Sequence, residues 1–155
     1  MKTKVQIEDT YKTGLNLKRK ISKIVNLLFE NEEIKNNSAI KGFEAETLSF
    51  DVVFTDDDNI HQINKQYRKK DSPTDVITFA LFADDDNKFM FDKTIELGEI
   101  IISVDTAKRQ AKISLENEIL ILICHGILHL LGFDHLTDED YNFVVGIQDS
   151  VISKL

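Results

Sequence analysis

Four segments of the chain carry the pattern of apolar residues that is typical of β-strands. Apolar and polar positions alternate around residues 5–7 and through 48–55, which indicates strands with one buried face. The segments 73–82 and 97–105 are rich in β-branched and aromatic residues and are also predicted to be strands. The polar segment between them, residues 82–96, is expected to be a loop or a hairpin connection.

Elsewhere the apolar residues recur at helical spacing. Residues 17–28 place them on one face of an amphipathic helix, and a second helix is expected to begin at Asp56. A short helical piece is expected near residues 105–112. The hydroxyls of Ser114 and Thr137 are suited to satisfy free backbone N–H groups, so each is predicted to begin a further helix.

The order of these elements predicts an α+β fold. Strands and helices are mixed without repeats or a linker, and the length of 155 residues suits a single domain, residues 1–155. We expect a small mixed sheet of about four strands packed with about five helices, and the histidine motif on a central helix. The only cysteine, Cys124, excludes an intramolecular disulfide, and the longest apolar run, residues 119–124, is too short to span a membrane. We therefore expect a soluble, cytoplasmic protein.

Charge is distributed unevenly along the chain. The formal net charge of −8 argues weakly against a general nucleic-acid binder, because phosphate contacts favour basic surfaces. Basic residues nevertheless gather in residues 12–23 and 64–70, whereas acidic residues gather at 56–58, 84–86 and 138–140. The basic runs are compatible with a basic binding face and equally with ordinary solvated helix faces.

Three of the four histidines lie within residues 125–135, in the most apolar part of the chain. His125 and His129 are one helical turn apart, so their imidazoles can reach the same ion. Gly132 allows a left-handed helix end, after which His135 would return as a third ligand. Three neutral imidazoles leave one position of a tetrahedral Zn²⁺ open, as in a catalytic site. The alternative, three core histidines, would require a separate hydrogen-bond partner for each ring. We therefore predict one zinc ion.

The residue after the first of these histidines argues against a protease. Zinc proteases share the spacing of His125 and His129 but need a glutamate directly after the first histidine as general base. Gly126 occupies that position and cannot accept a proton. Asp134 either replaces this base or orients a ligand imidazole from behind. A protease therefore ranks second.

A second candidate group ends the helix that begins at Asp56. Arg68, Lys69 and Lys70 stand there, just before the predicted strand 73–82. A guanidinium contacts phosphate with two N–H groups and stabilises charge that develops on it, whereas lysines hold a phosphate backbone by charge alone. The alternative is a solvated helix end that interacts favourably with the helix dipole.

Three blocks of the sequence resemble the YbeY family, the bacterial endoribonucleases also called rRNA maturation factors. HGILHLLGFDH at 125–135 fits the family signature H-G-x-L-H-L-x-G-x-D-H. INKQYRKKDSPTDVITF at 63–79 is similar to its N-x-x-Y-R and P-T-D-V-L-S-F block, and LGEIIIS at 97–103 to its L-G-D-I-x-I-S strand. The chain departs from the pattern at Thr78, where serine is usual, and at Glu99, where aspartate is usual.

The resemblance implies a zinc-dependent, single-strand-specific endoribonuclease that acts in 16S rRNA 3′-end maturation and ribosome quality control. It implies zinc ligands at His125, His129 and His135 and a catalytic role for Arg68; we add His125 as a catalytic residue and Lys69 or Lys70 as backbone contacts. The expected partners are single-stranded RNA and the ribosome or its proteins, without membrane or DNA.

Two other interpretations of the function stay open. One is a zinc metalloprotease or another metal-dependent hydrolase, and the other is a non-catalytic, ribosome-associated zinc protein. For a ribonuclease, the sequence also leaves open whether water or the 2′-hydroxyl of the RNA is the nucleophile.

Overall fold

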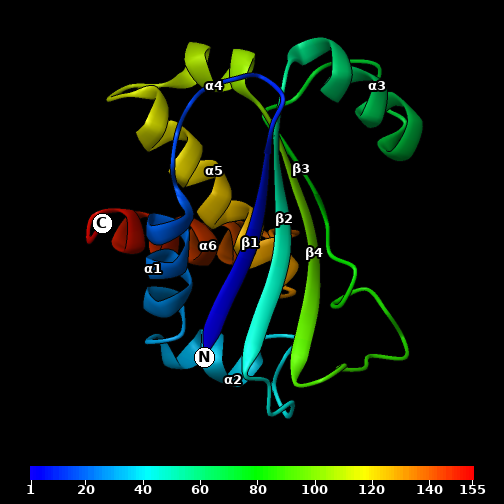
Figure 1. The fold of residues 1–155 in the computed structure, drawn as a ribbon, viewed down its shortest axis with the longest axis vertical. Coiled ribbons are helices and arrows are strands. Elements are labelled where there is room, and N and C mark those ends of the chain that lie inside the picture. The colour runs from blue at the N-terminus through cyan, green and yellow to red at the C-terminus, as the bar shows by residue number, and fades with distance from the viewer.

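The sheet at the centre of the molecule is mixed. Figure 1 shows the computed structural model, which describes residues Met1–Leu155, with four strands in the order β1-β2-β4-β3. The strands β1 (Lys2–Asp9), β2 (Thr47–Thr55) and β4 (Thr94–Ser103) are parallel, and β3 (Val76–Phe79) pairs antiparallel with β4. The predicted α+β fold with a small mixed sheet is therefore confirmed.

Six helices surround this sheet, one more than expected. They are α1 (Lys18–Leu28), α2 (Glu32–Asn37), α3 (Asp57–Arg68), α4 (Val104–Gln110), α5 (Leu115–Leu130) and α6 (Asp138–Ile152). In Figure 1, α1, α5 and α6 lie along one face of the sheet, while α3 and α4 lie at its upper end. The unexpected helix is α2, which is six residues long and buries only Ile34, so it leaves almost no periodic signal.

The main core lies between the sheet and α5. The apolar positions of β2 that alternate in the sequence, namely Leu48, Phe50, Val52 and Phe54, are all buried there. Residues of α5 are buried on most sides, which explains why its sequence is almost continuously apolar. No single helix is long and apolar enough to cross a membrane; α4 and α5 meet that test only together, with a bend of 113° between them.

The strand predicted over residues 73–82 is shorter in the structure, only four residues long. It ends at Phe79, where the backbone of β4 comes very close. A Cβ placed on Gly98 would lie 1.9 Å from the carbonyl oxygen of Phe79, and Gly98 has a φ of +138°, which side-chain-bearing residues rarely adopt. This approach ends regular pairing between β3 and β4.

The next strand, β4, is shifted toward the N-terminus from the predicted residues 97–105. It begins at Thr94, inside the segment expected to be a loop, because Asp92 and Lys93 form a two-residue turn with positive φ at both positions. It ends at Ser103, whose hydroxyl accepts the N–H of Thr106 and starts α4.

Candidate metal centre and active site

Local sequence determines both ends of α5. The hydroxyl of Ser114 accepts a backbone N–H of the first turn at 3.0 Å, as predicted for a helix cap. At the other end Gly132 has a φ of +91°. The N–H groups of Gly132 and Phe133 donate to the carbonyls of His129 and Leu128, respectively. These two bonds form the predicted left-handed helix end, which turns the chain back toward α5.

This turn brings the three predicted ligands together. One ligand atom each of His125, His129 and His135 lies within 4.8 Å of the others. The Nε2 atoms of His125 and His129 are 3.0 Å apart. Tetrahedral zinc, with Zn–N bonds of about 2.0–2.1 Å, would separate two ligand nitrogens by roughly 3.3 Å. The residues present therefore fit a zinc ion with small side-chain shifts.

One residue outside the triad orients the imidazole ring of His125. Gln148, on α6, accepts a hydrogen bond from Nδ1 of His125 at 3.3 Å. With its proton on Nδ1, neutral His125 presents a free lone pair on Nε2 for an ion. The other two rings have no hydrogen-bond partner outside the triad, which disfavours the alternative of three separately satisfied core histidines. Gln148 has no signal in the sequence, because its contact depends on how α6 packs against α5.

Replacing Gln148 by alanine is expected to weaken zinc binding about 10- to 100-fold, because the imidazole of His125 loses the partner that selects its tautomer. Competition with a chromophoric chelator measures this affinity. Gln148→Glu keeps an acceptor oxygen at the same place and should bind zinc nearly as well as the wild type. Equal affinities for all three proteins would contradict a positioning role.

Burial disfavours the charged form of two of the three rings. It lowers the pKa of His125, with repulsion from His135 as the next contribution. It also lowers the pKa of His129 to about 4, and repulsion from the other two histidines adds to the effect. Since only neutral imidazole binds a metal ion, the lowered pKa values favour His125 and His129 as donors at neutral pH.

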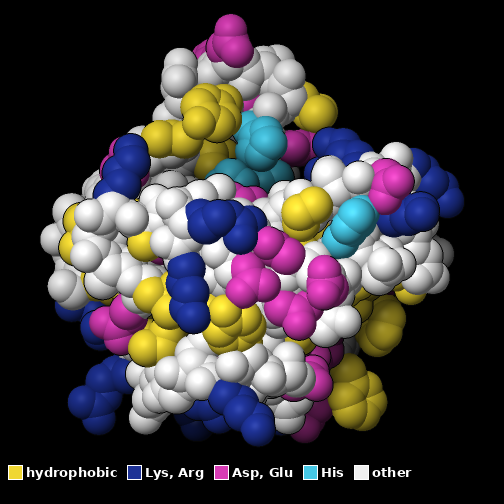
Figure 2. All heavy atoms as spheres, turned by 90° about the horizontal axis from the view of Figure 1, so that it is seen from above, with side chains coloured by type: hydrophobic (Ala, Val, Ile, Leu, Met, Phe, Trp, Pro, Cys, Tyr) yellow, Lys and Arg dark blue, Asp and Glu magenta, His cyan; other side chains and the backbone are white.

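The triad lies in a pocket of about 490 Å³ that Arg68 also lines. Figure 2 shows histidine side chains in a hollow of the surface, with hydrophobic side chains beside them and Lys and Arg side chains across from them. Arg68, the predicted phosphate contact, and the three predicted metal ligands therefore line the same pocket. The remaining lining residues come from the segment that leads through β3 and from the turn after α5: Thr74, Asp75, Val76, Thr78, Asp134 and Leu136.

Other predicted residues lie at the border of this pocket or outside it. Asp134 lines the pocket, and its Oδ1 accepts the backbone N–H of His135 at 2.8 Å, so it fixes the turn rather than an imidazole ring. Lys69 and Lys70 do not line the pocket. The Nζ of Lys69 donates to a backbone carbonyl of α3 at 3.3 Å. A role of these two lysines in holding RNA stays a prediction.

Two further side chains that carry potential chemistry lie outside the site. Cys124 is fully buried, and burial raises the pKa of its thiol to about 12, so it is a core residue. The fourth histidine, His61, is 2.7 Å from Asp71 on the surface and is not part of the triad.

Thr74 and Asp75 were not predicted as site residues. The Oδ1 of Asp75 accepts the N–H of Val76 at 2.8 Å, and its Oδ2 accepts from Gln110 at 3.2 Å. The carboxylate of Asp75 is therefore held rigidly in the pocket, where its charge raises the pKa of His125 against the larger effect of burial. The P-T-D triplet in the block that resembles the family is the only sequence signal for these residues.

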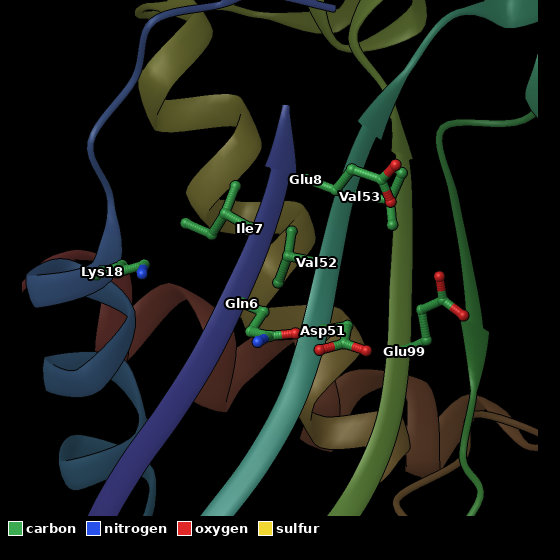
Figure 3. Close-up of a pocket in the computed structure, with 8 residues that line it drawn as sticks. All are labelled: Gln6, Ile7, Glu8, Lys18, Asp51, Val52, Val53 and Glu99. Atoms are coloured by element: carbon green, nitrogen blue, oxygen red, sulfur yellow. The ribbon is translucent and has the colours of Figure 1, made fainter. Parts of the chain in front are cut away.

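A second hollow, of about 380 Å³, lies on the sheet away from the triad (Figure 3). Gln6, Asp51 and Glu99 lie side by side there on β1, β2 and β4. Partial burial raises the pKa of Glu99, with Asp51 and Glu8 adding repulsion. Of the two departures from the family pattern, Glu99 is therefore outside the triad pocket, whereas Thr78 lines it.

Comparisons with known proteins show to which family the chain belongs. Residues 4–155 match the family model described as "Endoribonuclease YbeY". A relative called Endoribonuclease YbeY from Prochlorococcus marinus is 42% identical over 108 residues, which cover 68% of this chain and 57% of the relative. A relative of the same name from Staphylococcus saprophyticus is 39% identical over 136 residues, which cover 86% of this chain and 82% of the relative. A third, from Bacillus pumilus, is 35% identical over 153 residues, which cover 94% of this chain and 90% of the relative. A solution structure of TM1509 from Thermotoga maritima covers 98% of this chain and 87% of its own, with 24% identity and a TM-score of 0.49. The match over nearly all of its length shows that this chain belongs to the Endoribonuclease YbeY family.

Proposed function

We propose that this chain is an endoribonuclease that binds one zinc ion and cleaves single-stranded RNA. The observation that carries the proposal is the meeting of His125, His129, His135 and Arg68 at one pocket, in a member of an endoribonuclease family. The three imidazoles are a donor set for a metal ion with an open position, and the guanidinium is suited to a phosphate.

Each residue has a defined task in this proposal. The three histidines would hold zinc, which when bound supplies Lewis acidity toward a phosphoryl oxygen or toward water. Arg68 binds the phosphate of the RNA and stabilises the negative charge that grows on it during cleavage. Asp134 has one carboxylate oxygen without a protein partner, whereas both oxygens of Asp75 are engaged. Asp134 is therefore the proton acceptor that the pocket offers.

The test is cleavage of end-labelled RNA by the purified, zinc-loaded protein. We expect single-stranded RNA to be cut faster than the same sequence in a duplex, and zinc removal by a chelator to stop the reaction. Product ends identify the nucleophile: a 2′,3′-cyclic phosphate indicates the 2′-hydroxyl, and a 5′-phosphate indicates water. Casein hydrolysis without RNA cleavage would instead favour a protease.

We also propose that the protein acts in the cytoplasm, in 16S rRNA 3′-end maturation and ribosome quality control. The family resemblance supports this role. The net charge of −8 makes weak intrinsic affinity for RNA expected, so docking to the ribosome or to one of its proteins would raise the local concentration of substrate. Accumulation of 16S precursors with unprocessed 3′ ends on depletion, reversed only by a cleavage-competent copy, is the expected result in cells.

Replacing Arg68 by glutamine is expected to lower kcat about 100-fold or more, because a donor aimed at developing charge is lost. Arg68→Lys should restore only part of the activity, since an ammonium lacks the planar two-pronged geometry. Lys65→Gln, on the same helix but outside the pocket, is the matched control and should keep full activity. Zinc content should be unchanged in all three; loss of zinc from Arg68→Gln would contradict a direct role on phosphate.

A further inference from the structure

An exposed apolar edge borders the pocket next to the third histidine. Leu136 follows His135 directly, lines the pocket, and is 85% exposed. Tyr141, in the first turn of α6, is 52% exposed, and its ring centroid is 6.0 Å from that of His135. The Tyr141 and His135 rings meet at 85°, so they do not stack face to face, and Tyr141 keeps surface for a further contact.

Local structure holds this edge in place. Thr137 caps α6, with its hydroxyl accepting the N–H of Asp140 at 3.1 Å, and the N–H of Tyr141 donates to the carbonyl of Thr137 at 2.9 Å. Leu136 and Tyr141 therefore stand on either side of a well-formed helix start rather than on a long loop. Their positions relative to the triad are set before any ligand arrives, which lowers the entropy cost of binding.

The pocket is consequently divided into two kinds of surface. Arg68 and the three histidines line the pocket. Its apolar border consists of Leu136, which also lines it, and Tyr141, whose ring lies beside that of His135 just outside the lining. A strand of RNA has the same division, with a charged phosphate and a flat, uncharged base in each nucleotide. The acidic residues of the first turn of α6 would repel a phosphate at the apolar border, so this border accepts a base and not the backbone: Asp138, Glu139 and Asp140.

We propose that Leu136 and Tyr141 form a platform on which one RNA base stacks while the neighbouring phosphate lies between the triad and Arg68. The inference rests on the proposed ribonuclease function and adds a specificity element to that site. Stacking on a side chain requires a base that is free of its own stack, so the platform selects single-stranded RNA over duplex.

The experiment measures cleavage and binding of an end-labelled single-stranded RNA by the zinc-loaded protein. Base–aromatic stacking is worth roughly a factor of ten or more, so Tyr141→Ala should raise KM about tenfold with little change in kcat. Tyr141→Phe keeps the ring and should behave like the wild type, and Leu136→Ala should give a smaller rise. Ile113→Ala is the matched control, because Ile113 is an equally exposed apolar residue (82%) that does not line the pocket.

A second substrate separates stacking from a structural effect. When the base next to the cut is replaced by an abasic residue, wild type and Tyr141→Ala should have equal KM, because the platform has nothing to hold. A loss in Tyr141→Ala that is the same with both substrates, or no larger than that of Ile113→Ala, would overturn the platform. If the wild type cuts no RNA but binds it in a way that depends on Tyr141, the proposed function fails and the platform stands.

Discussion

Replacing His129 by alanine is expected to abolish zinc binding and to lower RNA cleavage at least about a thousandfold, because a metal ion contributes several kcal/mol to the transition state. His129 faces both other ligands and its Nε2 is 3.0 Å from that of His125, so the two remaining imidazoles cannot hold the ion in its place. Metal analysis of the purified protein and cleavage of end-labelled RNA give the two measurements.

His61→Ala provides the control for this experiment. His61 is the fourth histidine and contacts only Asp71 on the surface, so its removal should leave zinc content and cleavage intact. Circular dichroism should show the wild-type helix content for both variants, since His129 is only half-buried and is not part of the apolar core cluster. Substantial RNA cleavage by zinc-free His129→Ala would refute the metal-dependent proposal.

Gly126→Glu, which restores the glutamate of zinc proteases, is expected to destabilise the fold by about 3 kcal/mol or more and to create no protease. Gly126 is buried against β4, and a Cβ there would lie only 2.9–3.0 Å from side-chain atoms of Ile100. A carboxylate at this position would overpack the core and lose its hydration without a partner. It would also face the sheet and not the pocket. Urea unfolding measures the loss of stability, and casein hydrolysis tests the activity.

Gly126→Ala tests the effect of added side-chain volume at this position without adding a charge. Its methyl group would lie 2.9–3.0 Å from three side-chain atoms of Ile100, closer than a Cβ normally approaches, so the stiff, β-branched Ile100 must shift, and this cost opposes the gain of about 1 kcal/mol in helix propensity over glycine. The alanine variant should therefore be less stable than the wild type but more stable than Gly126→Glu, and adding Ile100→Val should recover part of the loss because it removes Cδ1, one of the three close atoms. A stable Gly126→Glu protein, or one that gains casein hydrolysis, would show that position 126 can reach the pocket.

The features that the sequence predicted well are encoded locally. The cap at Ser114, the helical spacing of His125 and His129 and the turn at Gly132 each depend on residues within a few positions, and together they predict α5 and the triad. The features that were missed depend on contacts between distant segments. Gln148 reaches His125 from α6, 23 residues further along the chain, and the sequence around Gln148 has no motif that marks it.

Gly126 illustrates the same limit. In the sequence, this position is notable only because it follows His125 and lacks the glutamate that zinc proteases have there. The structure gives a positive reason for glycine: α5 crosses Ile100 so closely that there is no room for a side chain. Only the packing of α5 on β4 reveals this contact, and no pattern along the chain encodes it.

One helix, α5, both fills the interior and supplies two of the three histidines that could hold a metal ion. Most residues of α5 that are not ligands are buried, so few of its positions are free to change without loss of stability. Variation in substrate preference therefore has more room at lining residues that have no proposed part in holding the ion or the phosphate, such as Thr74 and Leu136. The buried helix α5 and the exposed residues beside the pocket thus differ in how freely they can change. The exposed residues are therefore the first choice for engineering new cleavage preferences.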